Sequence, residues 1–281
     1  MSHNENVEER TEVAAADQEV RREMRPRTRR SFLVGAAAAL LGYGGWRWLK
    51  TSAEDVDGIP WPLRRSHEFN EHLARNYFST ARLAPTFPRH LANLPRANGD
   101  IGLDVEDFES AEWRLEVVNL TDSAKEEIEP SLSLGLEDIK ALPRVEEVTE
   151  LKCIEGWSQV VHWAGARFSD LADKYQLATR SGAPFDVENK ATDLVPYVSL
   201  ETPDGVYYVG LDIESALHPQ TLLCYEMDGE PLTLEHGAPL RLYVPVKYGI
   251  KSLKRIGRIT FTNKRPFDYW AERGYDWYSG H

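Results

Sequence analysis

One of the chain's two cysteines lies where a sulfur atom could take part in chemistry. Cys153 lies in residues 151–163, between an apolar run that predicts a strand and a short polar turn. A thiolate in such a turn can be a soft metal ligand or a nucleophile, whereas a buried thiol is simply a small hydrophobic side chain. The cysteine by itself favours the packed core residue, so its role depends on the rest of the chain.

A second feature is a basic stretch at residues 236–267. It contains no acidic residue, and its basic residues are Arg241, Lys247, Lys251, Lys254, Arg255, Arg258, Lys264 and Arg265. The whole chain has a net charge of −12; residues 1–50 contribute +2, so the remainder carries −14. Because an acidic protein repels nucleic-acid phosphates, we expect no nucleic-acid role, and the basic stretch predicts a site for a small anion.

Three segments, in this order, resemble one protein family. They are Cys-Ile-Glu-Gly-Trp-Ser at residues 153–158, Ala-Leu-His-Pro at residues 216–219, and the run from His236 to Lys254. With them, residues 113–270 are similar to the molybdopterin-binding oxidoreductases of the sulfite-oxidase fold. The nearest branch is the catalytic subunit of the periplasmic methionine sulfoxide reductase. The resemblance implies one molybdenum on a single molybdopterin, with Cys153 as the metal ligand from the protein.

The same resemblance implies the residues that hold the cofactor. They are Asn70, Thr202, His236, Arg241, Lys251, Ser252, Leu253 and Lys254. Arginine suits a bidentate contact with the cofactor phosphate, and lysine acts as a point charge beside it. Each lysine could instead be a solvated surface charge, and Asn70 an exposed amide. His236 stands where the reductase branch carries asparagine.

Glu155 is the ionisable side chain two positions after Cys153. Reduction of an S=O bond consumes protons, so a carboxyl group at this place predicts a proton relay. The alternative is an ion pair with Lys152 or Arg258. Sulfite oxidases carry an arginine near this turn, whereas residues 156–158 are Gly-Trp-Ser here. This difference favours a neutral sulfoxide or N-oxide over an oxyanion as substrate.

Short strands and a few short helices must position these side chains. Alternation of apolar and polar residues, or apolar runs between turn signals, predicts strands near 113–119, 145–153, 197–202, 206–210, 222–227, 240–246 and 257–262. Short helices are expected at 134–143 and at 168–175, the second with Ser169 as its N-cap. This composition predicts an α+β domain with a mixed sheet or squashed barrel over residues 113–281.

The rest of the chain predicts two further parts. Residues 54–112 form an arm expected to pack on the main domain, with an amphipathic helix near residues 68–78. Residues 1–53 predict a disordered tail followed by a signal or anchor. Sulfite oxidases continue into a dimerisation domain, for which this chain has no length left, so a monomer is expected.

The segment around Arg29 and Arg30 resembles a twin-arginine export signal, because Phe-Leu and a mildly apolar run follow the paired arginines. The alternative is an ordinary single-pass helix, although residues 32–49 fall short of the roughly 20 residues that a span needs. No clear cleavage site is present. The expected location is the periplasm or the outer face of the cytoplasmic membrane after twin-arginine export. Whether the segment is cleaved or retained as an anchor stays open.

These features predict oxygen-atom transfer on a small molecule, most readily the reduction of an S-oxide or N-oxide. The sequence has no haem, flavin or iron–sulfur motif, so electrons must come from a partner, and the resemblance suggests a membrane haem b subunit. The alternative is a non-catalytic protein that binds or carries the pterin cofactor. A cysteine-dependent hydrolase would need a His/Asp pairing that the sequence lacks. Cys224 is expected in the core, and its pairing with Cys153 stays open.

Overall fold

The computed structural model describes residues 30–104, 108–120, 132–181 and 193–281. Contacts divide the chain into two compact units, Met1–Pro62 and Leu63–His281. In the first unit, residues 30–51 form a helix that includes most of the expected export segment. Thr28 and Arg29 of the twin-arginine motif lie outside the described residues. Within the described ranges, no helix is both long enough and apolar enough to cross a membrane.

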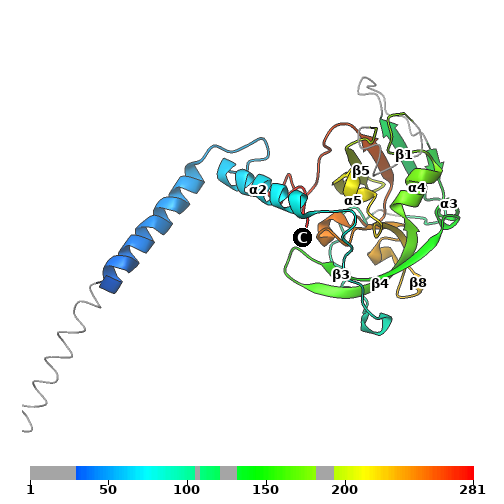
Figure 1. Cartoon of the computed structure of the whole chain (residues 1–281), viewed down its shortest axis with the longest axis horizontal. Helices are drawn as coiled ribbons and strands as arrows, with labels where there is room; N and C mark the ends of the chain where they lie inside the picture. The colour runs from blue at the N-terminus through cyan, green and yellow to red at the C-terminus, as the bar shows by residue number, and fades with distance from the viewer. Residues whose placement is uncertain (1–29, 105–107, 121–131, 182–192) are drawn as a thin grey trace, which may run out of the picture. The chain divides into compact units, whose positions relative to one another are not determined.

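The second unit contains two five-stranded sheets (Figure 1). The first has the order β2-β1-β10-β5-β6, with bounds Leu132–Leu134, Leu115–Leu120, Arg258–Thr262, Tyr197–Glu201 and Tyr208–Asp212. In the second, β3 (Arg144–Lys152), β4 (Ser158–Arg167), β7 (Leu222–Met227) and β8 (Glu230–Pro231) follow one another, and β9 (Arg241–Tyr243) also pairs with β7. β1 and β10 are parallel and their other neighbours antiparallel, so the predicted α+β domain with a mixed sheet is confirmed.

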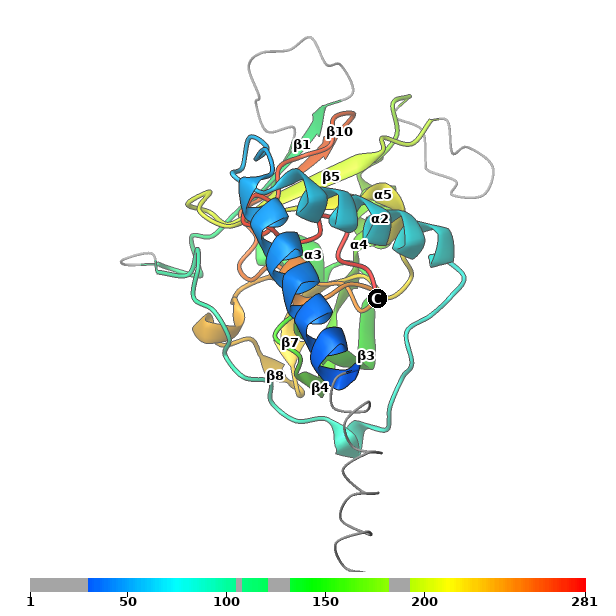
Figure 2. The same ribbon diagram turned by 90° about the vertical axis from the view of Figure 1, so that its left-hand side faces the viewer.

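Short helices connect and cover the sheets. They are α2 (Trp61–Tyr77), α3 (Leu136–Lys140), α4 (Phe168–Lys174) and α5 (Ile213–Ala216), with 3-10 turns η1 (Arg89–Leu91), η2 (Leu234–His236) and η3 (Gly249–Lys251). Figure 2 shows β1, β5 and β10 on one side of the unit and β3, β4, β7 and β8 on the other. The side chains between them form the main core, in which Phe168 of α4 packs 6.0 Å from Phe261 of β10, measured between ring centroids.

Besides the short strands β2 and β8, the sequence did not predict β4, the longest strand in the structure's described part. Its central residues are all buried, because β4 lies between β3 and β7 and is covered on both faces. Such a strand shows a continuous apolar run rather than alternation, so periodicity does not identify it. β4 and β7 approach each other closely at Gly165, where a Cβ atom would lie 2.1 Å from the carbonyl oxygen of Leu223.

Two details of the helices differ from the prediction. The expected N-cap Ser169 is wrong: the N-cap is Arg167, because α4 begins at Phe168 directly after β4 ends. The amphipathic helix begins earlier than predicted, at Trp61. The expected strand at 240–246 is shorter and ends at Tyr243. The arm contacts the second sheet, since Thr86 bridges to Thr149 and the Asn93 N–H donates to the Val160 carbonyl at 3.0 Å.

Two buried ion pairs fix the segment after β9. The Lys251 ammonium donates to Asp268 at 2.5 Å and to the Gly210 carbonyl at 2.9 Å. The Lys247 ammonium donates to Asp212 at 3.2 Å, and burial lowers the pKa of Lys247 to about 7, although Asp212 opposes this shift. Both lysines are almost fully buried. These two lysines therefore stabilise the fold by pairing with buried carboxylates, and they are not available to a bound anion.

Replacing Lys251 with methionine should lower the free energy of unfolding of the cofactor-free protein by about 3–5 kcal/mol, because Asp268 would stay buried without its partner. Urea unfolding measures this loss. The double variant Lys251→Met with Asp268→Asn removes both charges and should recover most of the stability. Equal midpoints for the wild type and the single variant would contradict this account of the pair.

Candidate active site

The Cys153 turn is the tip of the β3–β4 hairpin. The Cys153 N–H donates to the Trp157 carbonyl at 2.9 Å, and the Gly156 N–H donates to the Cys153 carbonyl at 3.1 Å. Gly156 has a φ of 89°, a left-handed conformation that glycine adopts without strain. The turn is therefore tight and well hydrogen-bonded, and it leaves the Cys153 side chain half-buried at the edge of a cavity.

Three side chains surround the sulfur of Cys153. The Asn98 amide nitrogen lies 3.8 Å from the sulfur and 3.2 Å from a Glu155 carboxylate oxygen. The Trp157 indole N–H donates to the same Glu155 oxygen at 3.1 Å. This oxygen lies 3.9 Å from the Cys153 sulfur. Glu155 thus has neutral donors as partners, and the alternative ion pair is not formed. The Lys152 ammonium lies 3.9 Å from a Glu150 carboxylate oxygen, and Arg258 pairs with Glu116 and Glu201.

The protein's own groups do not favour a thiolate at Cys153. Burial raises the pKa of the thiol, and the negative charge of Glu155 raises it further. A nucleophilic cysteine needs the opposite surroundings, with a cation or histidine that lowers its pKa. A bound metal ion deprotonates a coordinating thiol outright. The surroundings of Cys153 therefore fit a metal ligand better than the nucleophile of a hydrolase.

Two cations also line the cavity. Arg241 is buried on β9, donates to the carbonyls of His236 at 3.1 Å and Ser252 at 3.3 Å, and stacks 4.6 Å from the centre of the Trp163 ring. Its Nε atom is buried with no hydrogen-bond partner. Burial lowers the pKa of Arg241 to about 10. Among the described residues no carboxylate lies within ion-pair distance, so this buried guanidinium lacks a counter-charge.

Lys254 is the second cation that lines the cavity. Its ammonium donates to the carbonyls of Asn98 at 3.1 Å and Gly99 at 2.8 Å. Burial lowers its pKa to about 8, and the charge of Arg241 adds to the shift. Two neighbouring cations repel each other, and an anion bound between them offsets this repulsion. The pair therefore has the composition of a phosphate site.

The remaining predicted residues divide into two groups. Ser252 lines the cavity beside Arg241, and its hydroxyl accepts from the Val244 N–H at 3.2 Å. Lys251 and Leu253 do not line it: the first is paired with Asp268, and the second lies in the core. Since Gly249 and Ile250 line the cavity, the segment still contributes backbone to it.

His236 and Thr202 hold the loops around the cavity. The His236 ring lies 2.8 Å from the Thr233 hydroxyl and 3.1 Å from the Pro95 carbonyl, and burial lowers its pKa. A neutral His236 therefore fixes the arm near Pro95, which lines the cavity. The Thr202 hydroxyl is buried and donates to Asp204 at 2.5 Å, next to Gly102.

The asparagine of the site is Asn98 rather than the predicted Asn70. Asn70 is exposed on α2 and is not among the residues that line the cavity, whereas Asn98 touches both Cys153 and Glu155. The arm places Asn98 there in an irregular segment, where no periodicity marks a position in the sequence. The only available signal was the residue type itself, and the arm holds several asparagines.

The cavity has a volume of about 170 Å³, and one wall is aromatic. Trp157, Tyr207, Trp270 and Tyr275 line it. The ring centroids of Trp270 and Tyr275 are 5.2 Å apart, and the Tyr207 hydroxyl donates to the Ile250 carbonyl at 2.7 Å. Arg96 also lines the cavity, from the arm and not from the Cys153 turn.

The lining of this cavity fits a molybdenum–pterin cofactor. Cys153 supplies the soft donor that molybdenum accepts, and Arg241 and Lys254 supply two cations for a phosphate. Gly237 keeps the loop beside Lys254 compact, since a Cβ atom there would lie 2.8 Å from the backbone of residues 254–255. The other cysteine plays no part: Cys224 is buried, both thiols are free, and burial raises the pKa of Cys224 to about 12.

Comparison with known proteins gives matches over this region. A family model described as the oxidoreductase molybdopterin binding domain matches residues 102–270. A protein of Azospira oryzae provisionally named protein-methionine-sulfoxide reductase subunit YedZ1 is 31% identical over 253 residues, which cover 89% of this chain and 85% of that protein. The protein-methionine-sulfoxide reductase catalytic subunit MsrP of Xanthomonas campestris is 33% identical over 174 residues, 62% of this chain and 54% of MsrP.

Two further matches differ in kind. An uncharacterised oxidoreductase of Bacillus subtilis, YuiH, is 34% identical over 61% of this chain and 77% of its own length. Among solved structures, the sulfane dehydrogenase SoxCD of Paracoccus pantotrophus has a TM-score of 0.44 and 19% identity, covering 66% of this chain and 46% of that chain. The alignments with the MsrP proteins span about half the length of those relatives.

Proposed function

Because the chain belongs to the molybdopterin-binding oxidoreductase family of the sulfite-oxidase fold, we propose that it reduces an S-oxide or N-oxide by oxygen-atom transfer. The observation that carries this proposal is the cavity that Cys153 lines together with Lys254 and the buried cation Arg241, whose Nε atom has no hydrogen-bond partner. The names of the relatives, methionine-sulfoxide reductases, support an S-oxide as the substrate class.

The proposed cofactor is molybdenum on one molybdopterin. When bound, it supplies a metal that changes oxidation state by two electrons while accepting or releasing an oxygen atom. Cys153 would ligate the metal, and Arg241 and Lys254 would pair with the phosphate. Ser252 and the backbone of residues 249–254 would border the cofactor. His236 and Thr202 would act by holding the arm and the neighbouring loop in place.

We assign proton delivery to Glu155. Conversion of a sulfoxide oxygen to water consumes two protons and two electrons, so the site needs a group that moves protons between solvent and the reacting oxygen. Glu155 is exposed to solvent, yet one of its carboxylate oxygens is held 3.9 Å from the Cys153 sulfur. Asn98 and Trp157 fix this oxygen by donating to it, so the carboxyl group keeps one orientation.

The cavity wall supports a neutral, partly apolar substrate. Aromatic side chains attract sulfur-containing groups through contacts worth about 0.3–1.5 kcal/mol each. The residues of the Cys153 turn provide no cation, and the guanidinium of Arg96 is exposed on the arm. The turnover rate should therefore be higher with a dialkyl sulfoxide than with an anionic S-oxide of similar size.

Turnover with an artificial donor tests the proposed function. Purified protein with molybdenum should oxidise reduced methyl viologen when a sulfoxide is added, and the thioether should appear in equal amount. The alternative function, a non-catalytic carrier of the pterin cofactor, predicts bound cofactor with no turnover on any S-oxide or N-oxide. A membrane haem b protein is the proposed physiological donor, since the relatives are named as a subunit and as a catalytic subunit.

The affinity of the cofactor-free protein for inorganic pyrophosphate should fall as the pH rises through about 8. Below its lowered pKa of about 8 the Lys254 ammonium is charged and can pair with the anion, and above it the amine is neutral. Calorimetric titration between pH 6.5 and 9.5 measures the effect. The variant Lys254→Met should bind pyrophosphate more weakly at pH 7, and its affinity should no longer fall near pH 8. A wild-type affinity that stays constant up to pH 9.5 would remove Lys254 from the phosphate site.

Export through the twin-arginine route is a further part of the proposal, motivated by Arg29 and Arg30 before an apolar segment. Folded export suits a protein that must enclose its cofactor first. Changing both arginines to lysine should leave the protein, with full molybdenum content, in the cytoplasm of fractionated cells. Unchanged export of the double-lysine variant would indicate an ordinary signal anchor.

A further inference from the structure

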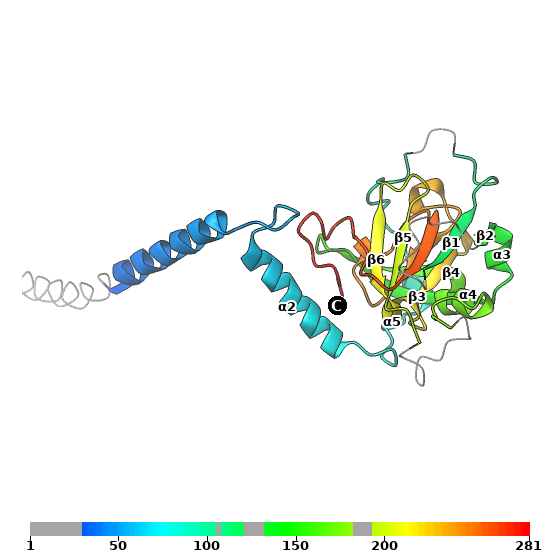
Figure 3. The same ribbon diagram turned by 90° about the horizontal axis from the view of Figure 1, so that it is seen from above.

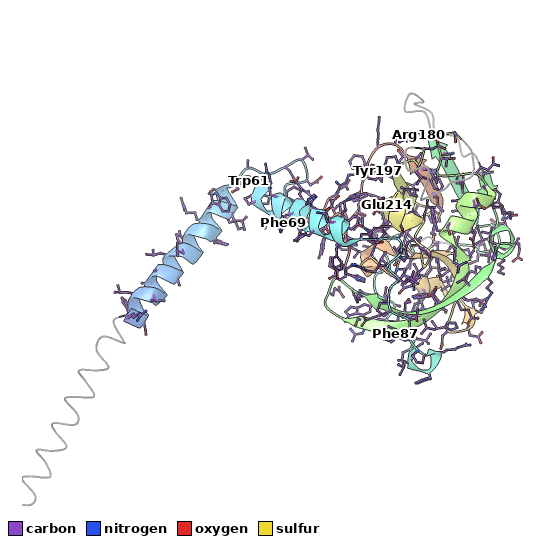
Figure 4. All side chains as sticks on the ribbon, in the orientation of Figure 1. Trp61, Phe69, Phe87, Arg180, Tyr197 and Glu214 are labelled. Atoms are coloured by element: carbon purple, nitrogen blue, oxygen red, sulfur yellow. The ribbon has the colours of Figure 1, made fainter. Side chains whose placement is uncertain are left out.

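Helix α2 carries an apolar row that the fold does not use. Residues 65, 69, 73 and 77 follow one another at intervals of four, so their side chains lie along one side of the helix. The row begins with Arg65 and continues with the apolar residues Phe69, Leu73 and Tyr77. Phe69 is 61% exposed, Leu73 50% and Tyr77 72%. Leu83, just beyond the helix, is exposed as well. Figure 4 shows Phe69 on α2, and no residue of this helix is buried.

The other side of α2 fixes its orientation. Glu71 pairs with Arg75 at 2.9 Å within the helix and with Arg265 at 2.6 Å on the segment after β10. The Arg75 guanidinium lies 4.6 Å from the centre of the Tyr278 ring. Ala74 packs against the small cluster of Ala271, Trp277 and Tyr278, and Figure 3 shows α2 beside this C-terminal segment. The contacts hold the helix firmly, with its apolar row directed to solvent.

Charge distinguishes this surface from the rest of the protein. Residues 61–83 contain four arginines and two glutamates, a net of +2, whereas residues 84–281 carry a net of −13. Arg65 is exposed in the same row as Phe69, and Arg82 stacks 4.1 Å from the centre of the Tyr77 ring. Arginines beside aromatic and leucine side chains are typical of a helix that lies in a lipid interface.

Chain connectivity supplies an independent argument. The helix of residues 30–51 exposes Leu40, Leu41, Tyr43, Trp46 and Trp48, and tryptophan and tyrosine concentrate at membrane–water interfaces. Residues 52–60 connect it to α2, and nine residues reach at most about 32 Å. A surface that binds the first helix is therefore within reach of α2. A bilayer is large enough to take both.

We propose that α2 is a lipid-contacting surface, on which Phe69, Leu73 and Tyr77 enter the headgroup region of an anionic bilayer. Arg65 and Arg82 pair with lipid phosphates beside them. Each basic side chain near an anionic membrane surface contributes attraction that falls off within a Debye length, so the binding depends on salt. The contact holds the catalytic unit against the membrane independently of which substrate it reduces.

The test places an environment-sensitive fluorophore on the full-length protein at Phe69→Cys. Vesicles of phosphatidylcholine with phosphatidylglycerol should shift its emission to the blue. The matched control carries the fluorophore at Leu91→Cys, also exposed but on η1, and should not respond. Labelled wild-type protein provides the background from Cys153. Vesicles of phosphatidylcholine alone should bind at least tenfold more weakly, and so should the variant Phe69→Ser, Leu73→Ser, Tyr77→Ser on anionic vesicles.

Two results would overturn the proposal. In the first, the fluorophore at position 69 stays in water while the protein sediments with anionic vesicles, and the triple-serine variant binds as tightly as the wild type. In the second, the fluorophore responds only to vesicles that contain the membrane haem b subunit, which would make this face a protein–protein interface.

Discussion

Replacing Cys153 with serine is expected to reduce sulfoxide turnover to the background of the assay while the protein stays folded. The hydroxyl group is a hard donor with a much higher pKa than a thiol, so it cannot reproduce a soft sulfur ligand. The fold should survive, because Cys153 lies half-buried at a hairpin tip whose backbone hydrogen bonds do not involve the side chain. Circular dichroism and viologen-linked turnover measure the two properties.

Cys224→Ala is the matched control for this variant. It removes the only other thiol from a fully buried position, so it should cost some stability but leave turnover intact. Undiminished turnover in Cys153→Ser would show that the metal has no ligand at this position. Loss of turnover in both variants would instead point to a general effect of removing thiols.

Arg241→Met is expected to lose the cofactor. A charge-assisted contact contributes about 1.5–3 kcal/mol, so retention should fall roughly ten- to a hundredfold. The purified variant should contain far less than one molybdenum per chain. Inorganic pyrophosphate should raise the melting temperature of the cofactor-free wild type, since a bound ligand stabilises the folded state, and should leave that of the variant unchanged.

Lys264→Met is the control, since it removes a basic residue of the same stretch that is exposed and lies outside the cavity. It should keep full molybdenum content and the full response to pyrophosphate. If Arg241→Met also kept both, the phosphate would have to be bound elsewhere. A variant that lost molybdenum but still responded to pyrophosphate would show that Arg241 contacts another part of the cofactor.

The sequence predicted the kind of chemistry at the site better than it predicted which residues form the site. Cys153 and Glu155 lie together because they are two residues apart in one turn, which sequence spacing alone determines. The absence of acidic residues predicted an anion site in the basic stretch, and the resemblance implied Arg241, Lys251 and Lys254 as its cations. Neither argument could exclude Lys251, because its partner Asp268 lies outside the basic stretch and pairs with it only in the folded chain.

The parts that the sequence missed depend on tertiary contacts. β4 shows no alternation because both its faces are covered. Asn98 reaches Cys153 because the arm crosses the second sheet, where Gln159 donates to the Leu94 carbonyl at 2.6 Å. Neither contact has a local signal in the chain. The basic stretch likewise combined residues with different roles. Besides the cations of the site and the buried ion pairs, Arg255 donates to backbone carbonyls, Arg258 and Arg265 form partly exposed ion pairs, and Lys264 is exposed.

X-ray absorption at the molybdenum edge tests the central claim most directly, because it counts the sulfur atoms bound to the metal. The proposed single pterin dithiolene would supply two sulfurs, and Cys153 would add a third. We expect three sulfur ligands in the wild type and in Cys224→Ala, and two in Cys153→Ser. Three sulfur ligands in Cys153→Ser, or a wild-type protein without molybdenum, would contradict the account.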